Sequence, residues 1–167
     1  HYEYAKYMLN NKKHVLCEKP AVIKKAQAEE LYSLAKENNV VFMEAVKTAY
    51  CPGFHAMMAA AKSGKIGRII DVEAAFSRLT PVNTREYMAQ DYNGSFLEFG
   101  SYVCMPVFEL LGCDYDDVRF HSMRAVNGVD AYTKAVFSFG GKSAEVKTGL
   151  GVKTEGQLLI SGTNGYI

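Results

Sequence analysis

The run His14-Val15-Leu16-Cys17-Glu18-Lys19-Pro20 decides how the first part of this chain folds. Its apolar residues predict a short strand over His14–Glu18, and Pro20 ends that strand because proline has no N–H and a fixed φ. Lys19 precedes the proline and is therefore expected to be extended. Ligands of open α/β sheets bind at the carboxyl ends of strands. Glu18 and Lys19 are thus either ligand-binding groups or an ordinary solvated pair before a turn.

The sequence on both sides of this run alternates between helix and strand patterns. Residues 2–11 can form a helix, and Lys24–Glu37 places leucine and alanine opposite its charged residues. Val40–Val46 is a second apolar strand. A helix–strand–helix–strand order is typical of doubly wound α/β folds, whose strands are parallel.

Pro52-Gly53 interrupts this pattern, so we expect a domain boundary there, between residues 1–50 and residues 51–167. The second part is predicted to be an α+β domain with an open, largely antiparallel sheet. Its helices are expected at residues 54–62 and 96–111, and its strands at residues 66–76, 118–126, 133–139, 143–150 and 158–161. We expect the sheet face that the helices leave uncovered to be apolar, which would suit a dimerisation unit.

Three local signals refine the second part. Pro106 lies inside a predicted helix, so a kink or an altered helix start is expected. Residues 80–94 are polar and irregular, and they suit a loop over a pocket. Phe139-Gly140-Gly141-Lys142 predicts a hairpin turn.

Composition excludes several classes of function. The chain has 167 residues, of which 49% are hydrophobic and 22% are charged, so a folded globular protein is expected. Its net charge is +1 with dispersed Lys and Arg, which argues against nucleic acid as a partner. There is no apolar stretch of the roughly 20 residues that a membrane helix needs. The four cysteines form no CxxC or zinc-type spacing, so we expect no metal site, reduced thiols and a cytoplasmic protein.

The two ends suggest a fragment of a longer protein. Position 1 is His rather than Met, and residues 158–167 resemble a strand–turn–strand. Gly149-Leu150-Gly151 lacks the third glycine of a dinucleotide-binding loop and opens no helix. If the protein uses a dinucleotide, its phosphate-binding part is expected before His1. The chain alone is then expected to bind a dinucleotide poorly and to be inactive.

A second polar constellation lies in the predicted helix over residues 96–111. Glu98 and Tyr102 are four residues apart and therefore share one helix face. A carboxylate and a phenol on one face could bind a polyol and move a proton. An unperturbed phenol has a pKa of about 10, and a nearby lysine ammonium would make it a usable acid or base near neutrality. The alternative is a packed tyrosine whose hydroxyl reaches the surface.

Four motifs together resemble the glucose–fructose oxidoreductase/inositol dehydrogenase (Gfo/Idh/MocA) family. They are the run 14–20, Phe42-Met43-Glu44-Ala45, Ser63-Gly64-Lys65-Ile66-Gly67, and residues 94–102. Their order and spacing agree with the family over essentially the whole chain. With a tyrosine at position 102, the last motif resembles that of the branch of dimeric dihydrodiol dehydrogenases and glucose–fructose oxidoreductases.

The resemblance implies the last part of a Rossmann domain, followed by an incomplete C-terminal α/β domain. It implies hydride transfer between NAD or NADP and a sugar, polyol or dihydrodiol-like substrate, in a homodimer or higher homo-oligomer. Carried over to this chain, Lys19 lies at the reacting oxygen and Tyr102 is the acid/base. Glu18 and Pro20 bind the cofactor, and Glu98 binds the substrate.

Three departures from the family pattern weaken a substrate assignment. Glu98 is one methylene longer than the usual Asp, and Ala49 stands where many members of the branch have Arg. Asn93-Gly94-Ser95 has one glycine where the family often has three. A ligand-sensing or regulatory member without turnover is therefore an alternative to an enzyme.

Overall fold

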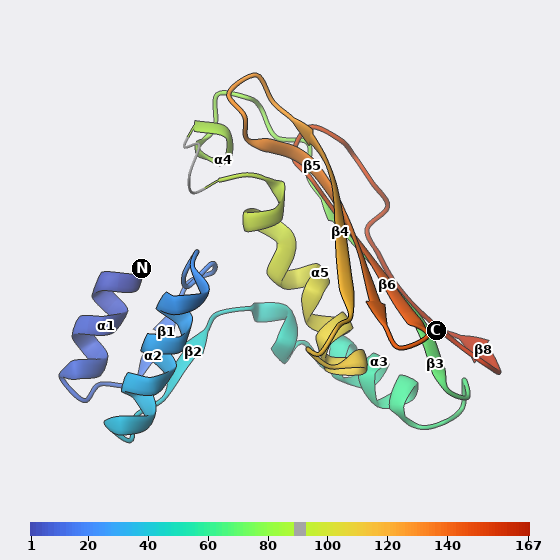
Figure 1. Ribbon diagram of the computed structural model, residues 1–167, viewed down its shortest axis with the longest axis horizontal. Helices are drawn as coiled ribbons and strands as arrows, with labels where there is room; N and C mark the ends of the chain where they lie inside the picture. Colours follow the sequence, from blue (N-terminus) through green and yellow to red (C-terminus); the bar gives the residue numbers. More distant parts are fainter. Residues whose placement is uncertain (89–92) are drawn as a thin grey trace. The chain divides into compact units, whose positions relative to one another are not determined.

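The computed structural model describes residues 1–88 and 93–167, and the chain divides into two compact units, residues 1–47 and residues 48–167 (Figure 1). Each unit has its own hydrophobic core.

The first unit is a two-stranded parallel sheet with two helices. It contains α1 (Tyr2–Asn10), β1 (Val15–Cys17), α2 (Lys25–Glu37) and β2 (Phe42–Glu44). β1 and β2 are parallel, with Val15 opposite Phe42 and Cys17 opposite Glu44, so both strands end at the same edge. Leu9 and Leu31 are fully buried between the helices and the sheet. The predicted Rossmann-type order is confirmed.

The second unit is built on a six-stranded open sheet with the order β4-β5-β6-β3-β7-β8. Its strands are β3 (Ile69–Ser77), β4 (Asp117–Arg124), β5 (Asp130–Phe139), β6 (Lys142–Gly149), β7 (Gln157–Gly162) and β8 (Gly165–Tyr166). β3 pairs with β6 in parallel, and the other neighbouring strands in this order are antiparallel. This confirms the predicted open, largely antiparallel sheet, and β5 and β6 form the predicted hairpin.

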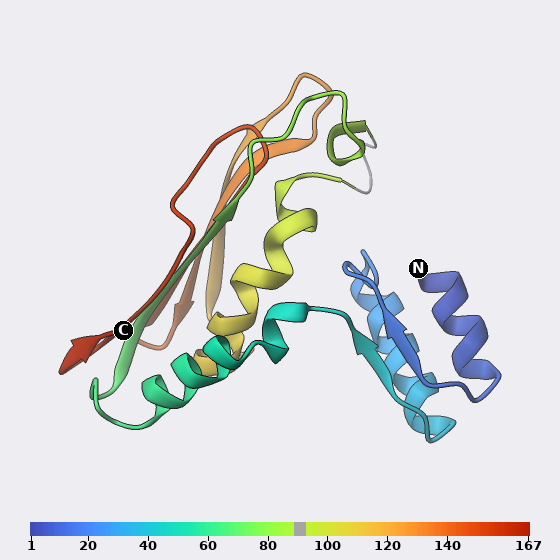
Figure 2. The same ribbon diagram turned by 180° about the vertical axis from the view of Figure 1, so that it is seen from behind.

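Helix α5 (Ser95–Leu111) packs on one face of this sheet, against β3, β5 and β6 (Figures 1 and 2). Helix α3 (Pro52–Lys62) adds Met58 and Ala61 to the same core. Small or β-branched residues of the sheet, such as Ala135 and Val146, are fully buried there. Pro106 lies inside α5, and the helix begins well upstream of it at Ser95, so the proline does not set the helix start.

The start of α5 is fastened to the sheet by one carboxylate, that of Asp130 at the beginning of β5. Its Oδ2 accepts hydrogen bonds from the Ser95 hydroxyl (2.6 Å), the Phe96 backbone N–H (2.9 Å) and the Thr133 hydroxyl (2.8 Å). The Ser95 hydroxyl also lies 2.9 Å from that of Thr148 on β6. A negative charge on free N–H groups at a helix start is stabilising. Asp130 therefore fixes the position of α5 on β5 and β6.

Gly94, which precedes α5, is required by this contact. Its φ is +126°, and a Cβ at this position would lie 1.9 Å from Asp130 Oδ1. The Asp130 carboxylate thus leaves no room for a side chain at position 94, the single glycine of Asn93-Gly94-Ser95.

The expectation of an apolar uncovered face is wrong. Side chains alternate along β5 and β6, and those that point away from the buried face include Lys134, Glu145 and Lys147. Glu145 pairs with Lys134 at 2.5 Å and with Lys147 at 3.3 Å. Burial raises the pKa of the Glu145 carboxyl, but the two lysines outweigh it and hold this pKa below the ordinary value. The sheet does have an apolar face, but helix α5 covers that face.

Two short helices were not predicted. The 3-10 helix η1 (Lys47–Tyr50) connects β2 to α3, and α4 (Arg85–Met88) lies within the predicted loop 80–94. Residues 89–92 of that loop lie outside the described residues.

Replacing Gly94 by Ala tests the Asp130 contact, with Gly112→Ala as the matched control. Gly112 ends the same helix with φ +89°, and nothing lies within 4 Å of a Cβ built there. Gly112→Ala should lower the free energy of unfolding by about 1–3 kcal/mol, the range for backbone strain. Gly94→Ala should cost about 1–3 kcal/mol more, because the new methyl displaces a hydrogen-bonded carboxylate. Urea unfolding measures both, and equal losses would contradict the proposed role of Asp130.

Candidate functional site

The first group of predicted site residues lies at the carboxyl edge of β1 and β2. Glu18, Lys19 and Pro20 follow β1 directly, and Lys19–Pro20 is a cis peptide bond. The Lys19 backbone N–H donates to Glu18 Oε2 at 3.3 Å. Glu18 is exposed, while Lys19 and Pro20 are partly buried. The Glu-Lys-Pro turn thus lies at the sheet edge where parallel strands end.

Glu44 at the end of β2 holds this turn in place. Its Oε1 accepts a hydrogen bond from the Ala21 backbone N–H at 2.8 Å. The Ala45 N–H donates to the Cys17 carbonyl at 2.7 Å, and this bond extends the parallel pairing by one residue. Sequence reasoning gave Glu44 no role. Its position at the end of the second parallel strand was the available signal.

The second group lies on α5. Glu98 and Tyr102 are one turn apart, and both side chains are partly exposed. The Tyr102 ring lies against Phe76 of β3, with ring centroids 5.7 Å apart, and Phe99 packs on Phe76 at 4.9 Å. The structure thus brings Glu98 and Tyr102 together on one helix, next to an aromatic pair.

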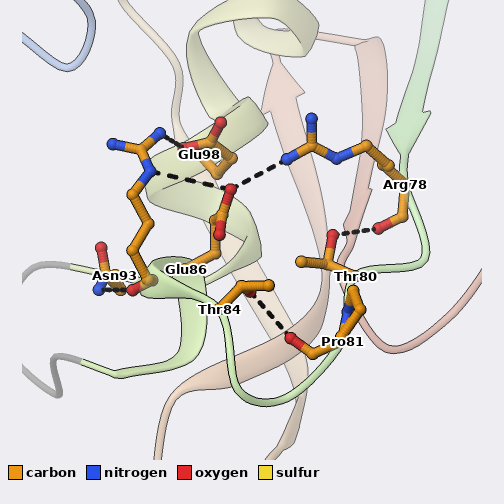
Figure 3. Close-up of polar contacts among 8 residues, drawn as sticks. Arg78, Thr80, Pro81, Thr84, Glu86, Asn93 and Glu98 are labelled. Atoms are coloured by element: carbon orange, nitrogen blue, oxygen red, sulfur yellow. Dashed lines mark hydrogen bonds and ion pairs between the residues drawn. The ribbon is translucent and has the colours of Figure 1, made fainter.

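Glu98 lies at one end of a row of charged side chains, as Figure 3 shows. Arg85 of α4 lies 3.7 Å from Glu98 Oε2 and 3.9 Å from Glu86 Oε1. Arg78, which follows β3, donates to Glu86 Oε1 at 3.0 Å. We call Arg78, Arg85, Glu86 and Glu98 the four-charge cluster.

Glu86 is the buried member of the four-charge cluster, with 8% of its surface exposed. Its own backbone N–H holds the pKa of the Glu86 carboxyl below the ordinary value, with further contributions from Thr84, Arg85 and Arg78, and burial acts in the opposite direction. A buried carboxylate with these partners stays ionised at neutral pH. Sequence reasoning missed both Glu86 and Arg85, because they lie in a segment whose composition resembles an ordinary polar loop.

The short helix α4 is held by contacts on each side of Glu86. The Tyr87 side chain is buried in a small core with Phe99, Val129 and Leu150. The Tyr87 carbonyl accepts a hydrogen bond from the Asn127 side chain, and the Arg85 carbonyl accepts one from Asn93. The backbone that carries Arg85 is therefore fixed, although the arginine side chain is exposed.

Two cysteines near these groups are unsuited to nucleophilic chemistry. Burial raises the pKa of Cys104, on α5, to about 12, and burial also raises the pKa of Cys17, at the end of β1. The thiolate is the reactive form of cysteine. Any chemistry at the Glu-Lys-Pro turn or on α5 therefore depends on the oxygen and nitrogen groups of these residues.

The residues of the first unit fit one end of a dinucleotide. Residues 1–47 contain no glycine, so this unit has no glycine-rich loop for a pyrophosphate. It does place a carboxylate and an ammonium, Glu18 and Lys19, after a parallel strand. A carboxylate can accept, and an ammonium can donate, hydrogen bonds to the hydroxyl groups of a ligand at this edge.

Comparison with known proteins identifies the family. Residues 1–46 match the model described as "Oxidoreductase family, NAD-binding Rossmann fold", and residues 54–167 match the GFO/IDH/MocA C-terminal domain. The chain belongs to the GFO/IDH/MocA family of oxidoreductases. This confirms the family that the sequence motifs indicated, and with it the expectation of NAD or NADP as the cofactor.

This chain has curated relatives that include two named dehydrogenases. It is 33% identical over 154 residues to scyllo-inositol 2-dehydrogenase (NADP(+)) IolU of Bacillus subtilis, covering 86% of this chain and 45% of that protein. It is 29% identical over 164 residues to the trans-1,2-dihydrobenzene-1,2-diol dehydrogenase of Xenopus laevis, covering 95% of this chain and 49% of that protein. The chain thus spans about half the length of these relatives.

Solved structures agree on the fold. The crystal structure of the probable oxidoreductase yhhX is 29% identical with a TM-score of 0.81, covering 99% of this chain and 48% of that one. GenD2 from gentamicin A biosynthesis, solved in complex with NAD, has a TM-score of 0.88 at 21% identity, covering 99% of this chain and 50% of that one.

Among residues 1–88 and 93–167, no group of three or more His, Cys, Asp or Glu side chains could hold a metal ion. No helix in this part of the chain is both long and apolar enough to cross a membrane.

Glu86→Gln tests the electrostatics of the four-charge cluster. Because the pKa of folded Glu86 is lowered, its ionised form stabilises the fold above the unfolded value near 4.5, and this contribution is lost as pH falls through the folded pKa. At pH 7 the substitution should lower the free energy of unfolding by about 1–2 kcal/mol. The difference between wild type and variant should shrink below pH 4.

Asp117→Asn is the matched control, because Asp117 pairs with Arg119 at 3.0 Å on the surface. An exposed pair contributes at most about 1 kcal/mol. Denaturant unfolding from pH 3 to pH 7 measures both variants. A Glu86→Gln difference that does not change with pH would contradict the assigned ionisation.

Proposed function

We propose that this chain is part of an NAD(P)-dependent oxidoreductase that acts on the CH–OH group of a sugar, polyol or dihydrodiol-like substrate. The observation that carries the proposal is the placement of Glu98 and Tyr102 one turn apart on α5, beside Arg85 and Phe76. Polar groups and an exposed aromatic ring are the two features that a polyol ring, with hydroxyl edges and C–H faces, requires.

Tyr102 is the proposed general acid/base. In the oxidation direction its phenolate takes the proton of the substrate hydroxyl, while the hydrogen on the carbon that bears this hydroxyl leaves as hydride. When bound, NAD or NADP supplies the acceptor of that hydride. In the reverse direction the phenol returns the proton to the carbonyl oxygen.

Lys19 is the proposed partner of Tyr102 in the intact enzyme. Its ammonium stabilises the negative charge that grows on the substrate oxygen. Glu18 and Pro20 are proposed to contact the nicotinamide ribose. Glu98 is proposed to accept a hydrogen bond from a second substrate hydroxyl.

The names of the relatives support the substrate class. The first is named for a cyclitol and the other for a dihydrodiol, and both are rings with neighbouring hydroxyl groups.

A homodimer or higher homo-oligomer through the open sheet, and a cytoplasmic location, are further proposals. The charged uncovered face means that such an interface would be formed by ion pairs as well as apolar contacts.

Tyr102→Phe in the full-length protein tests the acid/base assignment. Loss of the hydroxyl should lower kcat for polyol oxidation by about 10²–10⁴-fold, the usual contribution of general acid–base catalysis. The dissociation constant for NADPH should change little. Stopped-flow measurement of NADPH formation gives kcat, and fluorescence titration gives the dissociation constant.

Tyr166→Phe is the matched control, because Tyr166 is 75% exposed on β8, the edge strand of the sheet. It should keep wild-type kcat. Retention of full activity by Tyr102→Phe would exclude the proposed role. A wild-type protein that binds NADPH and a polyol but transfers no hydride would favour the regulatory alternative, which Ala49 and Glu98 suggest.

A further inference from the structure

We propose that Arg85 is a substrate-binding residue of this site, and that the buried carboxylate of Glu86 is the residue that positions it. The inference rests on the proposed function, because it names the group that receives the hydroxyl oxygens of a neutral polyol. Neither residue lies in the four sequence motifs that resemble the family.

Arg85 has the exposure that ligand binding requires. Its side chain is 80% exposed, although its backbone lies in α4, which is held by the buried Tyr87 ring and by hydrogen bonds from Asn93 and Asn127. Its ion pairs use Nε towards Glu86 and Nη2 towards Glu98. A guanidinium has five N–H donors in a fixed plane. Donors therefore remain for oxygen atoms of a ligand next to Glu98.

Glu86 is the buried carboxylate within ion-pair distance of that guanidinium. The carboxylate is buried, and its Oε1 is shared between Arg78 at 3.0 Å and Arg85 at 3.9 Å (Figure 3). Arg78 is itself held above the Phe99 ring, with its guanidinium carbon 5.8 Å from the ring centre. This chain of contacts runs from the core to Arg85. Glu86 acts through Arg85 and does not itself reach the substrate.

The charges of the cluster indicate what kind of substrate fits. Two guanidiniums, Arg78 and Arg85, face two carboxylates, Glu86 and Glu98, so the four side chains sum to zero. A phosphate or carboxylate on the substrate would find no excess positive charge among these four groups. A neutral polyol can donate a hydroxyl hydrogen to Glu98 and accept from Arg85 with the neighbouring oxygen. Two adjacent hydroxyl groups match this donor–acceptor pair.

The test is the affinity of the full-length protein, saturated with the reduced cofactor that it binds, NADH or NADPH, for scyllo-inositol and for trans-1,2-dihydrobenzene-1,2-diol. With the cofactor reduced and the ligand an alcohol, no hydride is transferred, so binding is measured without turnover. Isothermal titration of Arg85→Gln should show an affinity at least about tenfold weaker for the polyol that wild type binds, the value of one charge-assisted hydrogen bond. Arg85→Lys should restore part of the loss.

Glu86→Gln should weaken the same affinity about threefold, a fraction of the Arg85→Gln loss because it acts only through Arg85, and should leave NADPH binding unchanged. Arg119→Gln is the matched control: Arg119 is 79% exposed and pairs with one carboxylate, and its variant should bind the polyol like wild type.

Wild-type polyol affinity in Arg85→Gln would overturn the inference, as would a wild-type protein that binds neither polyol. If Glu86→Gln lowers the melting temperature but leaves polyol affinity unchanged, its positioning role is wrong. These readouts do not depend on proton transfer, so a failure of Tyr102 as acid/base would not affect them.

Discussion

The structure of the second unit depends on the contact between the Asp130 carboxylate and the start of α5. One oxygen of Asp130 accepts three hydrogen bonds from two elements, and Gly94 leaves the space that the other oxygen occupies. α5 carries Glu98 and Tyr102, and its first turn is the end next to α4. The same contact therefore fixes the helix on the sheet and sets where the candidate site residues lie.

The first unit has a similar contact at its Glu-Lys-Pro turn. There Glu44 accepts the N–H of Ala21 and holds the segment that contains Glu18, Lys19 and Pro20 at the strand ends. In both units a carboxylate on a strand or strand end binds a backbone N–H of the segment that carries the proposed chemistry. Carboxylate–N–H contacts are strong and directional. They allow a polar edge to be rigid without being deeply buried.

Much of the fold could be predicted from the sequence, because its elements depend on local patterns. The parallel strands around His14–Glu18 and Val40–Val46, the long helix at Glu98, and the hairpin at Gly140 all have strong local signals. The polarity of the uncovered sheet face was predicted wrongly, since it depends on which side chains of β5 and β6 share a face with α5. Glu86 and Arg85 were missed because their partners, Arg78 and Glu98, are close only after folding. The residues assigned from motifs, Lys19 and Tyr102, lie in different units, and their pairing remains a proposal.

We propose that Lys19 and Tyr102 act as one acid/base pair on the same substrate oxygen. A crystal structure of the full-length protein with NADPH and a bound polyol tests it most directly, through the positions of Lys19 Nζ and Tyr102 Oη. We predict that both atoms lie within hydrogen-bond distance of the same substrate oxygen, about 2.6–3.2 Å, or reach it through one water molecule. A structure in which the bound substrate contacts Tyr102 while Lys19 lies beyond the reach of a water bridge would exclude this pairing.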